Sequence, residues 1–599
     1  MKAPGIKSPA GNASFERPTQ KTSIILGRLW KYLSPYKWQL IIAVIISVAG
    51  NMMALVGPQL SGSAIDAIKT QSDKVDFGNV FHFAGLMLIF YVLSSLLSYI
   101  LSILMIRLSR NVIYRMRKDV FDKLTSLPVR FFDDRQTGDV ISVISYDIDT
   151  VNVSLSSDLV TMFSSVITVI GSFVMMLTIS PPLILIFAAA IPASMIFTHY
   201  RNKKVRPMYR ERSESLGDMN GYVEEMTSGV KTVKAYCREK EFVHQFDSFN
   251  EDAVESNYRA DSFSCMTGPM VNFINNISLA LISVFGSILY MAGGITLGNI
   301  SSFVLYSRKF SGPINEFANI ISDLQSALAA AERVLDLIDT PAEEPDVEGA
   351  VSLEDVKGDV TADSVHFSYD TGREILHGCS FHADPGQVIA VVGETGCGKT
   401  TLINLLMRFY DVDTGSIRVD GNDVRNVSRS SLRHSYTMVL QDTWLFYGTI
   451  FDNIAYGQEG VTRRDVEKAA QAAHIADYIE ALPNGYDTTL SENGLNISKG
   501  QKQLLTIARA MLLDSPMLIL DEATSNVDTQ TERRIQSAML ELMKGRTCFV
   551  IAHRLSTIRN ADCILVMNEG SIVESGTHDE LIKRHGVYYG MYRAQFEES

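Results

Sequence analysis

Long apolar runs alternate with polar segments over the first half of the chain. A helix that crosses a lipid bilayer needs about 20 mostly apolar residues, and residues 38–57 reach this length. Residues 77–106 do so as well, and they contain no Asp, Glu, Lys or Arg. The pattern therefore predicts membrane-spanning helices rather than a soluble N-terminal domain.

Two longer apolar runs are each interrupted by a turn signal. Residues 159–200 are broken at Pro181 and Pro182, and residues 262–307 contain the sequence MAGG near their middle. Proline pairs and glycine pairs are typical of turns, so each run predicts two helices and the chain six spans. Arg308 and Lys309 fall in the sixth span, where such charges face a cavity or a partner or lie at the membrane edge. The sequence leaves both alternatives open.

Lys and Arg residues are distributed unevenly around these spans. Segment 107–157 carries eight and segment 201–261 carries eleven, whereas the loop after the first span carries only two. Because basic segments stay on the cytoplasmic side, these segments and both chain ends are predicted to be cytosolic, in a multi-pass protein of the plasma membrane. Helical spacing in residues 110–127 predicts that the membrane helices continue into the cytosol.

The pattern changes in the second half of the chain to short β-branched runs that alternate with helical stretches, which is typical of an α/β domain. An acidic, proline-containing stretch precedes this change. We therefore predict a cytoplasmic leader at residues 1–24 and a six-helix membrane domain with long cytosolic loops at residues 25–337. A linker at residues 338–355 then leads to an α/β nucleotide-binding domain at residues 356–599.

Composition excludes some classes of protein. The chain is 46% hydrophobic and 20% charged, which fits part membrane protein and part soluble domain. The net charge of −13 argues against a nucleic-acid partner, since such proteins usually present a basic face. The six cysteines show no metal-binding or CxxC spacing and are interpreted as reduced thiols.

The sequence VIAVVGETGCGKTT at 388–401 matches the pattern GxxxxGK[ST] after an apolar strand. The backbone N–H groups of such a loop surround phosphate oxygens, and the helix N-terminus that follows favours an anion. Lys399 would reach the β- and γ-phosphates of ATP, and the Thr400 hydroxyl would bind Mg²⁺. The candidate ATP-binding residues here are Gly393, Glu394, Thr395, Gly396, Cys397, Gly398, Lys399, Thr400 and Thr401.

A second apolar strand ends in two acids, in MLILDEAT at 517–524. Asp521 would hold Mg²⁺ through water, and Glu522 would polarise the attacking water. A strand that merely ends in solvated acids is the plainer alternative, but it is a poor explanation in a chain with a phosphate-binding loop. Cys397 lies inside that loop, so alkylation of its thiol is expected to inhibit ATP hydrolysis, with ATP protecting.

These motifs together resemble an ABC exporter half-transporter of the bacterial multidrug type. Residues 127–151 and 222–239 resemble its two intracellular loops, each carrying a short transverse helix that presses on an ATPase domain. The resemblance implies that Tyr369 stacks on adenine, that Gln441 senses Mg²⁺ and water, and that His553 contacts the γ-phosphate. It also implies that residues 525–528 couple two sites across a dimer.

The signature motif of that family, of the form LSGGQ, departs from the pattern here. Its counterpart is Ile497, Ser498, Lys499, Gly500 and Gln501, with a lysine in place of a glycine. Glycine permits close backbone approach or a positive φ, and lysine does not do so freely. Since Glu522 and His553 are intact, the chain resembles the subunit with the complete catalytic site in heterodimeric ABC exporters. A homodimer that tolerates Lys499 is the alternative.

The expected activity is ATP-driven export of amphipathic small molecules, drug-like or lipid-like, by a dimer in the lipid bilayer. An exporter-fold importer of a metal chelate remains an alternative, as does an ATP-gated channel. The six spans and the acidic charge exclude a soluble ATPase of this family that acts on DNA or translation factors. The sequence does not identify the substrate.

Overall fold

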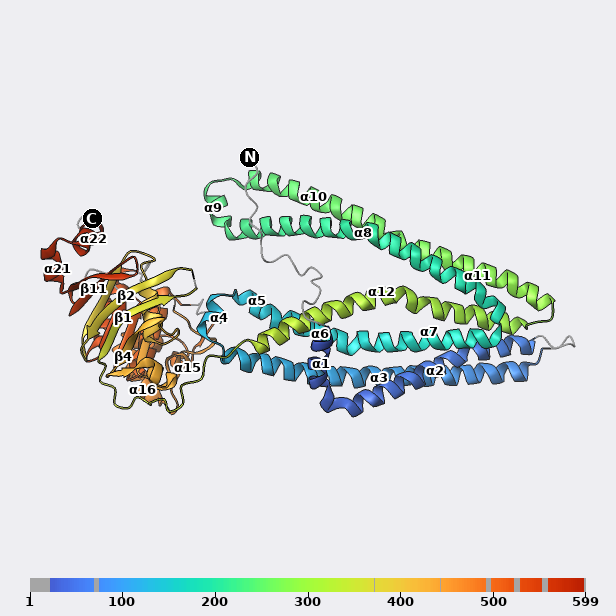
Figure 1. Ribbon diagram of the computed structural model, residues 1–599, viewed down its shortest axis with the longest axis horizontal. Coiled ribbons are helices and arrows are strands. Elements are labelled where there is room, and N and C mark those ends of the chain that lie inside the picture. The colour runs from blue at the N-terminus through green and yellow to red at the C-terminus, as the bar shows by residue number, and fades with distance from the viewer. Residues whose placement is uncertain are drawn as a thin grey trace. The chain divides into compact units, whose positions relative to one another are not determined.

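The computed structural model describes residues 22–68, 75–370, 372–441, 443–491, 497–521, 528–551 and 558–596. These residues form two compact units (Figure 1). The first comprises the described parts of Met1–Ser126 and Arg135–Thr340, and the second comprises the described parts of Leu127–Asp134 and Pro341–Ser599. The short segment Leu127–Asp134 therefore belongs to the second unit, although its sequence neighbours on both sides belong to the first.

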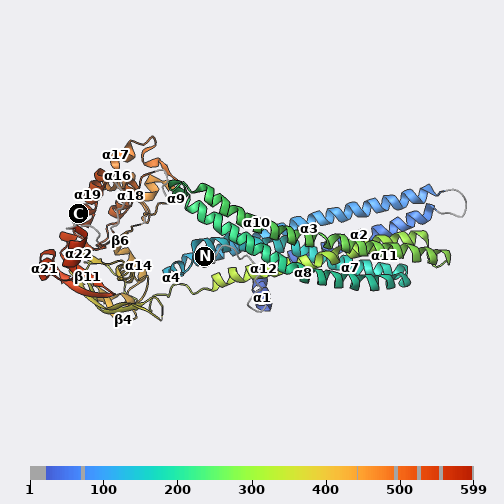
Figure 2. The same cartoon turned by 90° about the horizontal axis from the view of Figure 1, so that it is seen from above.

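The first unit is built from helices (Figures 1 and 2). Six long helices lie at the predicted spans, namely α2 Lys37–Ile68, α3 Phe77–Thr125, α7 Leu159–Ile179, α8 Pro181–Ser228, α11 Thr267–Met291 and α12 Leu297–Asp339. Helix α1 (Thr22–Leu33) and a single 3₁₀ turn (Ser34–Tyr36) precede them. Because about 20 residues suffice to cross a bilayer, α3, α8 and α12 extend well beyond the length of one span.

Both predicted turns separate helices in the structure. Ser180 is extended and α8 begins directly at Pro181, where a proline is tolerated because the first helical N–H groups need no partner. Helix α11 ends at Met291, and α12 begins at Leu297 after the threonine cap of Thr296. Among the described residues, four helical stretches are long and apolar enough to cross a membrane by length and composition: Thr22–Ile68, Phe77–Thr125, Thr137–Ile179 and Glu239–Met291.

The apolar segments of these four stretches are mostly uncovered by protein. Between 17% and 28% of the residues in each apolar window are buried inside the chain. The remaining apolar surface would be exposed to water in a soluble protein, whereas a lipid bilayer covers it without cost. These four stretches are therefore suited to cross a membrane.

Pro58 lies inside α2 and removes one backbone hydrogen bond of that helix. A proline has no N–H to donate to the carbonyl four residues earlier, which is Ala54. Lys309 of α12 donates its Nζ to that carbonyl oxygen at 2.7 Å, and Ser302 donates to the Pro58 oxygen at 2.8 Å. Thus the interior lysine satisfies the carbonyl that Pro58 leaves unpaired, while Arg308 is exposed.

The segment between α3 and α7 contains irregular helical turns. Helix α5 (Thr137–Ser142), the π-helical turn η3 (Val143–Asp147), α6 (Ile148–Val153) and the π-helical turn η4 (Ser154–Asp158) lead into α7. An ion pair of 2.5 Å between Arg333 of α12 and the buried Asp147 fixes η3 to α12. Helices α8 and α10 (Glu239–Cys265) lie side by side in both views, joined by α9 (Val230–Ala235) (Figures 1 and 2).

The second unit contains an antiparallel and a mainly parallel sheet. The antiparallel sheet has the order β2-β1-β4-β5, with β1 Val360–Ser368, β2 Glu374–Ala383, β4 Thr414–Val419 and β5 Asn422–Asp423. The larger sheet has the order β12-β11-β3-β10-β9-β6, with β3 Val388–Gly393, β6 Tyr436–Val439, β9 Met517–Asp521, β10 Thr547–Ile551, β11 Cys563–Asn568 and β12 Ser571–Gly576. A two-stranded pair joins β7 (Gly448–Thr449) to β8 (Thr489–Leu490).

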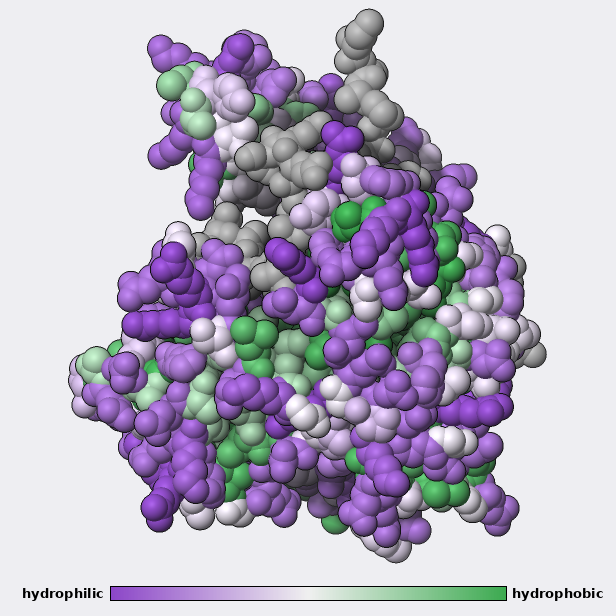
Figure 3. Space-filling view, turned by 90° about the vertical axis from the view of Figure 1, so that its left-hand side faces the viewer, coloured by the Kyte–Doolittle hydropathy of each residue, from purple (hydrophilic) through white to green (hydrophobic). Residues whose placement is uncertain are grey.

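The remaining elements of this unit are helices and 3₁₀ turns. They are α4 Val129–Asp133, α13 Lys399–Leu406, α14 Arg429–His434, α15 Ile450–Ile454, α16 Arg463–Ala472, α17 Ala476–Glu480, α18 Lys499–Leu512, α19 Thr529–Met543, α21 His578–Arg584 and α22 Val587–Phe596, with 3₁₀ turns at Val424–Asn426 and Gly485–Asp487. Along the strands of the larger sheet, successive side chains belong in turn to two buried clusters, one on each face of the sheet. The sheet therefore forms the centre of the core. The face of this unit that Figure 3 turns to the viewer is mostly hydrophilic, with hydrophobic residues scattered among polar ones.

Candidate functional site

Five strands of the larger sheet run parallel, so their carboxyl ends lie along one edge. Strand β3 pairs in parallel with β10, β10 with β9, and β9 with β6. In this register Ile551 lies between Val391 and Asp521 on the neighbouring strands. The segments that follow the four strands therefore begin side by side at one edge, the position where open α/β sheets bind ligands.

The phosphate-binding loop occupies the turn between β3 and α13. Gly396 and Gly398 have φ values of +87° and +102°, which only glycine adopts without strain. A Cβ at Gly398 would lie 2.7 Å from Leu376, so the close packing of the loop also requires a glycine there. The sequence thus folds this turn as the motif predicts, directly ahead of the N-terminus of α13.

Lys399 is tied back to the loop that carries it. Its Nζ donates to the backbone oxygens of Gly393 and Glu394, each at 2.8 Å. An ammonium group has three donors, and here they are held near the turn rather than in open solvent. Glu394, Thr395 and Thr400 are exposed at the same turn, so the loop presents a cation, backbone donors and a hydroxyl together.

Tyr369 lies at the end of β1, against the first turns of α13. Its hydroxyl donates to Thr401 Oγ1 at 3.2 Å, and its ring lies 5.0 Å from Tyr410 in an edge-on arrangement. Phe367 contacts both rings. The antiparallel sheet therefore places the aromatic ring that the sequence singled out directly beside the phosphate-binding loop, although the two are distant in sequence.

Asp521 and Gln441 lie at the carboxyl edge as well. Asp521 is the last residue of β9, and Gln441 follows β6 with an exposed side chain. The two other predicted catalytic residues, Glu522 and His553, lie outside the described residues, as do residues 525–527. The strands that precede them, β9 and β10, end at this edge.

The altered signature segment forms the N-terminus of α18. Ser498 caps the helix through a reciprocal pair with Gln501: the Ser498 N–H donates to Gln501 Oε1 at 2.9 Å, and the Gln501 N–H donates to Ser498 Oγ at 3.3 Å. Lys499 is the first helical residue and is exposed, whereas Gly500 is buried. Lys499 is not among the described non-glycine residues with positive φ, so the backbone strain expected from a lysine at this place is absent here.

Cys397 does not face outward from the loop. Its side chain is 5% exposed and belongs to the buried cluster on one face of the larger sheet. The sulfur lies 3.7 Å from Lys399 Nζ. The thiol is therefore shielded from reagents, so its alkylation should be slow.

Sequence reasoning did not identify Tyr410 as part of the site. Tyr410 donates its hydroxyl to Asp133 of the transverse helix α4 at 2.6 Å, and burial together with this bond raises its pKa. Arg130 of α4 also forms an ion pair with Asp370 at 3.3 Å. The aromatic residues Phe409 and Tyr410, which follow α13 in the sequence, were the signal that could have indicated this contact. The first intracellular loop thus contributes a short helix to this unit, as predicted.

The first unit contains a cavity of about 790 Å³ on its polar segments. It is lined by both π-helical turns and by residues of α3, α6 and α12. Such turns are frequent at functional sites because they redirect side chains. Its charged lining residues are three acids and one base: Asp149, Asp158, Asp323 and Arg117.

Comparisons with known proteins define the class. Residues 40–314 match the family of the ABC transporter transmembrane region, and residues 376–525 match the ABC transporter family. The chain belongs to the ABC transporters, as an exporter half-transporter that combines one membrane domain with one ATPase domain.

Individual relatives cover almost the whole chain. An uncharacterised ABC transporter ATP-binding protein of Bacillus subtilis is 41% identical over 96% of this chain and 94% of its own length. A fatty acid ABC transporter ATP-binding/permease protein of Mycobacterium bovis is 38% identical over 95% and 96%. The solved structure of a bacterial Atm1-family ABC exporter with ATP bound aligns with a TM-score of 0.75 at 30% identity, over 94% of this chain and 98% of that one.

Proposed function

We propose that the chain is one half of a dimeric pump in the plasma membrane, which uses ATP hydrolysis to export a drug-like or lipid-like amphipathic molecule. The observation that carries this proposal is the shared edge of the larger sheet. It gathers the phosphate-binding loop, Asp521 and Gln441 in a chain whose other unit exposes membrane helices. The excess of Lys and Arg in segments 107–157 and 201–261 favours a cytosolic ATPase domain.

ATP binding follows from the geometry of the loop. The γ-phosphate of ATP replaces the backbone oxygens of Gly393 and Glu394 as the partner of Lys399 Nζ. Backbone N–H groups of the loop and the N-terminus of α13 stabilise the other phosphate oxygens. Tyr369 stacks on the adenine ring, since its ring already lies beside α13 at the end of β1.

The residues present suit Mg²⁺. This ion prefers oxygen ligands and keeps several waters, and the Thr400 hydroxyl, the Gln441 amide oxygen and the Asp521 carboxylate all belong to segments at the same edge. These three residues would hold the ion, which neutralises charge on the phosphates when bound. Glu522 then accepts a proton from the attacking water, and His553 orients that water near the γ-phosphate.

A transport assay tests this proposal. The purified protein is reconstituted in liposomes with its ATPase domain outward, and uptake of an amphipathic dye is measured with ATP, with ADP and with no nucleotide. We expect saturable uptake with ATP alone, and its loss in Lys399→Ala. Passive conductance without saturation would indicate a channel. Dye movement out of the same vesicles would indicate an importer.

Several relatives support a lipid-like or drug-like substrate by their names. Curated relatives include an ATP-dependent lipid A-core flippase of Photobacterium profundum and a putative multidrug export protein of Bacillus subtilis. The cavity in the first unit combines apolar surface with charged residues, as a site for an amphipathic molecule requires.

We further propose that the partner in the dimer is a different half-transporter. In this family the signature of one subunit covers the nucleotide of the other. Here the long cationic side chain of Lys499 extends from the first turn of α18, where it would crowd the covered phosphate and hold it by charge. A heterodimer places this altered signature over one site only and leaves a regular signature for the chain's own site. A homodimer would carry the lysine in both.

A further inference from the structure

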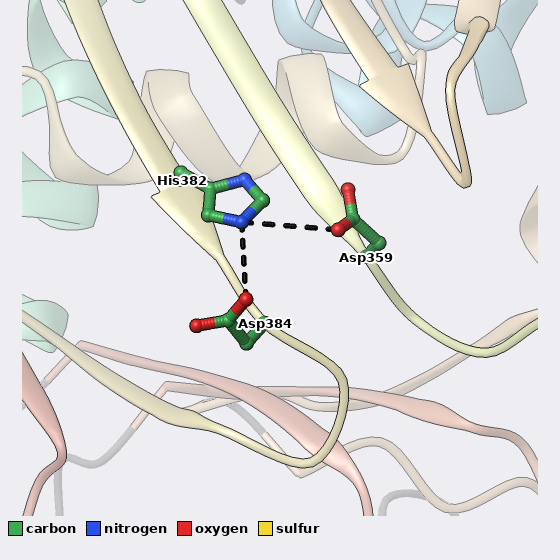
Figure 4. Close-up of side chains that lie close together, drawn as sticks. All are labelled: Asp359, His382 and Asp384. Atoms are coloured by element: carbon green, nitrogen blue, oxygen red, sulfur yellow. Dashed lines mark hydrogen bonds and ion pairs between the residues drawn. The ribbon is translucent and has the colours of Figure 1, made fainter.

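Asp359, His382 and Asp384 lie together at one end of the antiparallel sheet, outside the nucleotide site (Figure 4). His382 Nε2 is 3.2 Å from an oxygen of Asp384 and 3.8 Å from an oxygen of Asp359. One ligand atom from each residue lies within 4.8 Å of the other two. The imidazole thus has a carboxylate on either side.

The strand register brings these residues to one face of the sheet. Thr361 of β1 pairs with His382 of β2, and Val360 pairs with Ala383. Continuing this antiparallel register places Asp359 opposite Asp384. Side chains alternate between faces along a strand, so both aspartates share the face of the Thr361–His382 pair. Two carboxylates directly opposite each other are destabilising unless a cation lies between them.

Thr361 contacts the other ring nitrogen of His382. Its hydroxyl lies 2.9 Å from His382 Nδ1. When Nδ1 carries the proton and donates it to this hydroxyl, the lone pair of Nε2 points between the two carboxylates. Metal-bound histidines are usually held in this way by a hydrogen bond from their other ring nitrogen. An ionised carboxylate has no proton to donate to this lone pair, whereas a metal ion binds it.

The backbone at both ends of the cluster is fixed. The Asp359 N–H donates to Asp420 Oδ1 at 2.9 Å, and the Asp384 N–H donates to Gln387 Oε1 at 3.0 Å. The Asp384 side chain is 70% exposed and that of Asp359 is 38% exposed, so both have room for other rotamers. Rotamer changes therefore suffice to draw the three ligand atoms onto one ion, without moving the strands.

We propose that Asp359, His382 and Asp384 bind a divalent transition-metal ion of the Zn²⁺ class, which joins the ends of β1 and β2. One imidazole nitrogen and two carboxylate oxygens suit this ion, with bonds of about 2.0–2.2 Å. Water fills the remaining positions because the site is exposed.

This site is separate from the nucleotide site. Asp384 precedes β3, so the cluster lies near the amino end of that strand, whereas the phosphate-binding loop follows its carboxyl end. Tyr369 follows the opposite end of β1, about 30 Å from Asp359 at about 3.3 Å per residue. Metal binding at the cluster therefore leaves the affinity for ATP unchanged.

The test uses the untagged, chelator-treated full-length protein in detergent without nucleotide. Zn²⁺ binding is measured by titration calorimetry, and the unfolding temperature is measured with and without Zn²⁺. We expect one tight Zn²⁺ equivalent and a rise in unfolding temperature with Zn²⁺. His382→Ala and Asp384→Asn should each weaken binding at least ~10-fold, and Thr361→Val should weaken it about 10-fold. These positions are at the surface, and gel filtration confirms that each variant is folded.

Two matched variants make the outcome decisive. His434→Ala removes an exposed histidine of α14 that bonds to the Ser430 carbonyl. Glu374→Gln alters the other histidine–carboxylate group of the same sheet, in which Glu374 accepts from His366 and His377. Both should bind Zn²⁺ like the unmodified chain. Equal binding by His382→Ala, a loss confined to Glu374→Gln, or an unfolding temperature unaffected by Zn²⁺ would each overturn the proposal.

Discussion

At the residue scale, the catalytic assignment depends on a carboxylate directly after a buried strand. Glu522 follows Asp521, the last residue of β9, and the proposal makes it the group that polarises water. Glu522→Gln keeps the size and the hydrogen-bonding capacity of the side chain but cannot accept a proton. We expect ATP to bind normally and hydrolysis to fall about 100-fold or more. Nucleotide binding and phosphate release measured on the same preparation check this, and near-normal turnover would refute the role.

The cysteines offer a second test at this scale. Cys397 lies in the phosphate-binding loop with its side chain buried, whereas Cys237 and Cys265 are exposed. We expect an alkylating reagent to modify the exposed pair quickly and Cys397 slowly, with loss of ATPase activity following the slow step and ATP protecting against it. Mass spectrometry of the peptides resolves the order. Full activity after complete modification of Cys397 would contradict the link between this thiol and the site.

At the element scale, the contact between α2 and α12 explains a charge inside the membrane domain. Lys309 donates to the Ala54 carbonyl that Pro58 leaves without a partner. Lys309→Met should therefore cost about 1–3 kcal/mol, the usual penalty for an unsatisfied buried group. In a Pro58→Ala background the backbone N–H of residue 58 can reach Ala54, so the same substitution should cost less.

The measurement is the unfolding temperature of the single and double variants in detergent, read as a double-mutant cycle. Arg308→Met serves as the control, because Arg308 is the neighbouring exposed cation. Equal losses from Lys309→Met in both backgrounds would show that the lysine acts independently of Pro58.

The cavity of the first unit predicts a charge preference in the substrate. Three acids and one base line it, so a cationic amphipathic molecule is favoured over an anionic one. Asp323→Asn should raise the KM for a cationic dye by roughly two- to fivefold, as expected for a charge pair worth about 0.5–1 kcal/mol near solvent. Stimulated ATPase activity measures the KM, with a neutral dye for comparison. An equal effect from Asp252→Asn on α10 would contradict the assignment.

Elements with a local signal could be predicted from the sequence, and those that depend on distant contacts could not. The GxxxxGK[ST] spacing predicts the loop between β3 and α13, because its glycines fix the turn through their own φ values. Prolines and glycines likewise predict the helix ends at Pro181 and Met291. The hydrogen bond from Tyr410 to Asp133 joins residues 277 positions apart, and the pattern of apolar and polar residues along the chain does not predict such a contact.

Two further features could not be predicted from the residue type alone. Lys499 was expected to strain the signature backbone, yet a lysine fits the first turn of α18 because Ser498 and Gln501 cap the helix in a regular conformation. The burial of Cys397 had no signal in the sequence, since it depends on the tight turn that directs the side chain into the core. Local helix capping decided the first case, and tertiary packing decided the second.

At the scale of the whole molecule, the question is which chain completes the dimer. The side chain of Lys499 is the feature that favours a second, different half-transporter, because the residue does not have a positive φ. Expressed alone, the chain should therefore show little ATPase activity. Co-expression with the proper half-transporter should restore it, and that partner is expected to lack a glutamate at the position matching Glu522.

Shortening the side chain of Lys499 should therefore activate the homodimer. Lys499→Gly removes the long cation from both signatures, so the ATPase activity of the chain expressed alone should rise, while Lys583→Ala, an exposed lysine of α21, should leave it unchanged. Phosphate release per dimer with and without a transported dye measures both. A homodimer of the unmodified chain with rapid, dye-stimulated turnover would show that Lys499 is tolerated in both sites. The asymmetric dimer would then have no support from this residue.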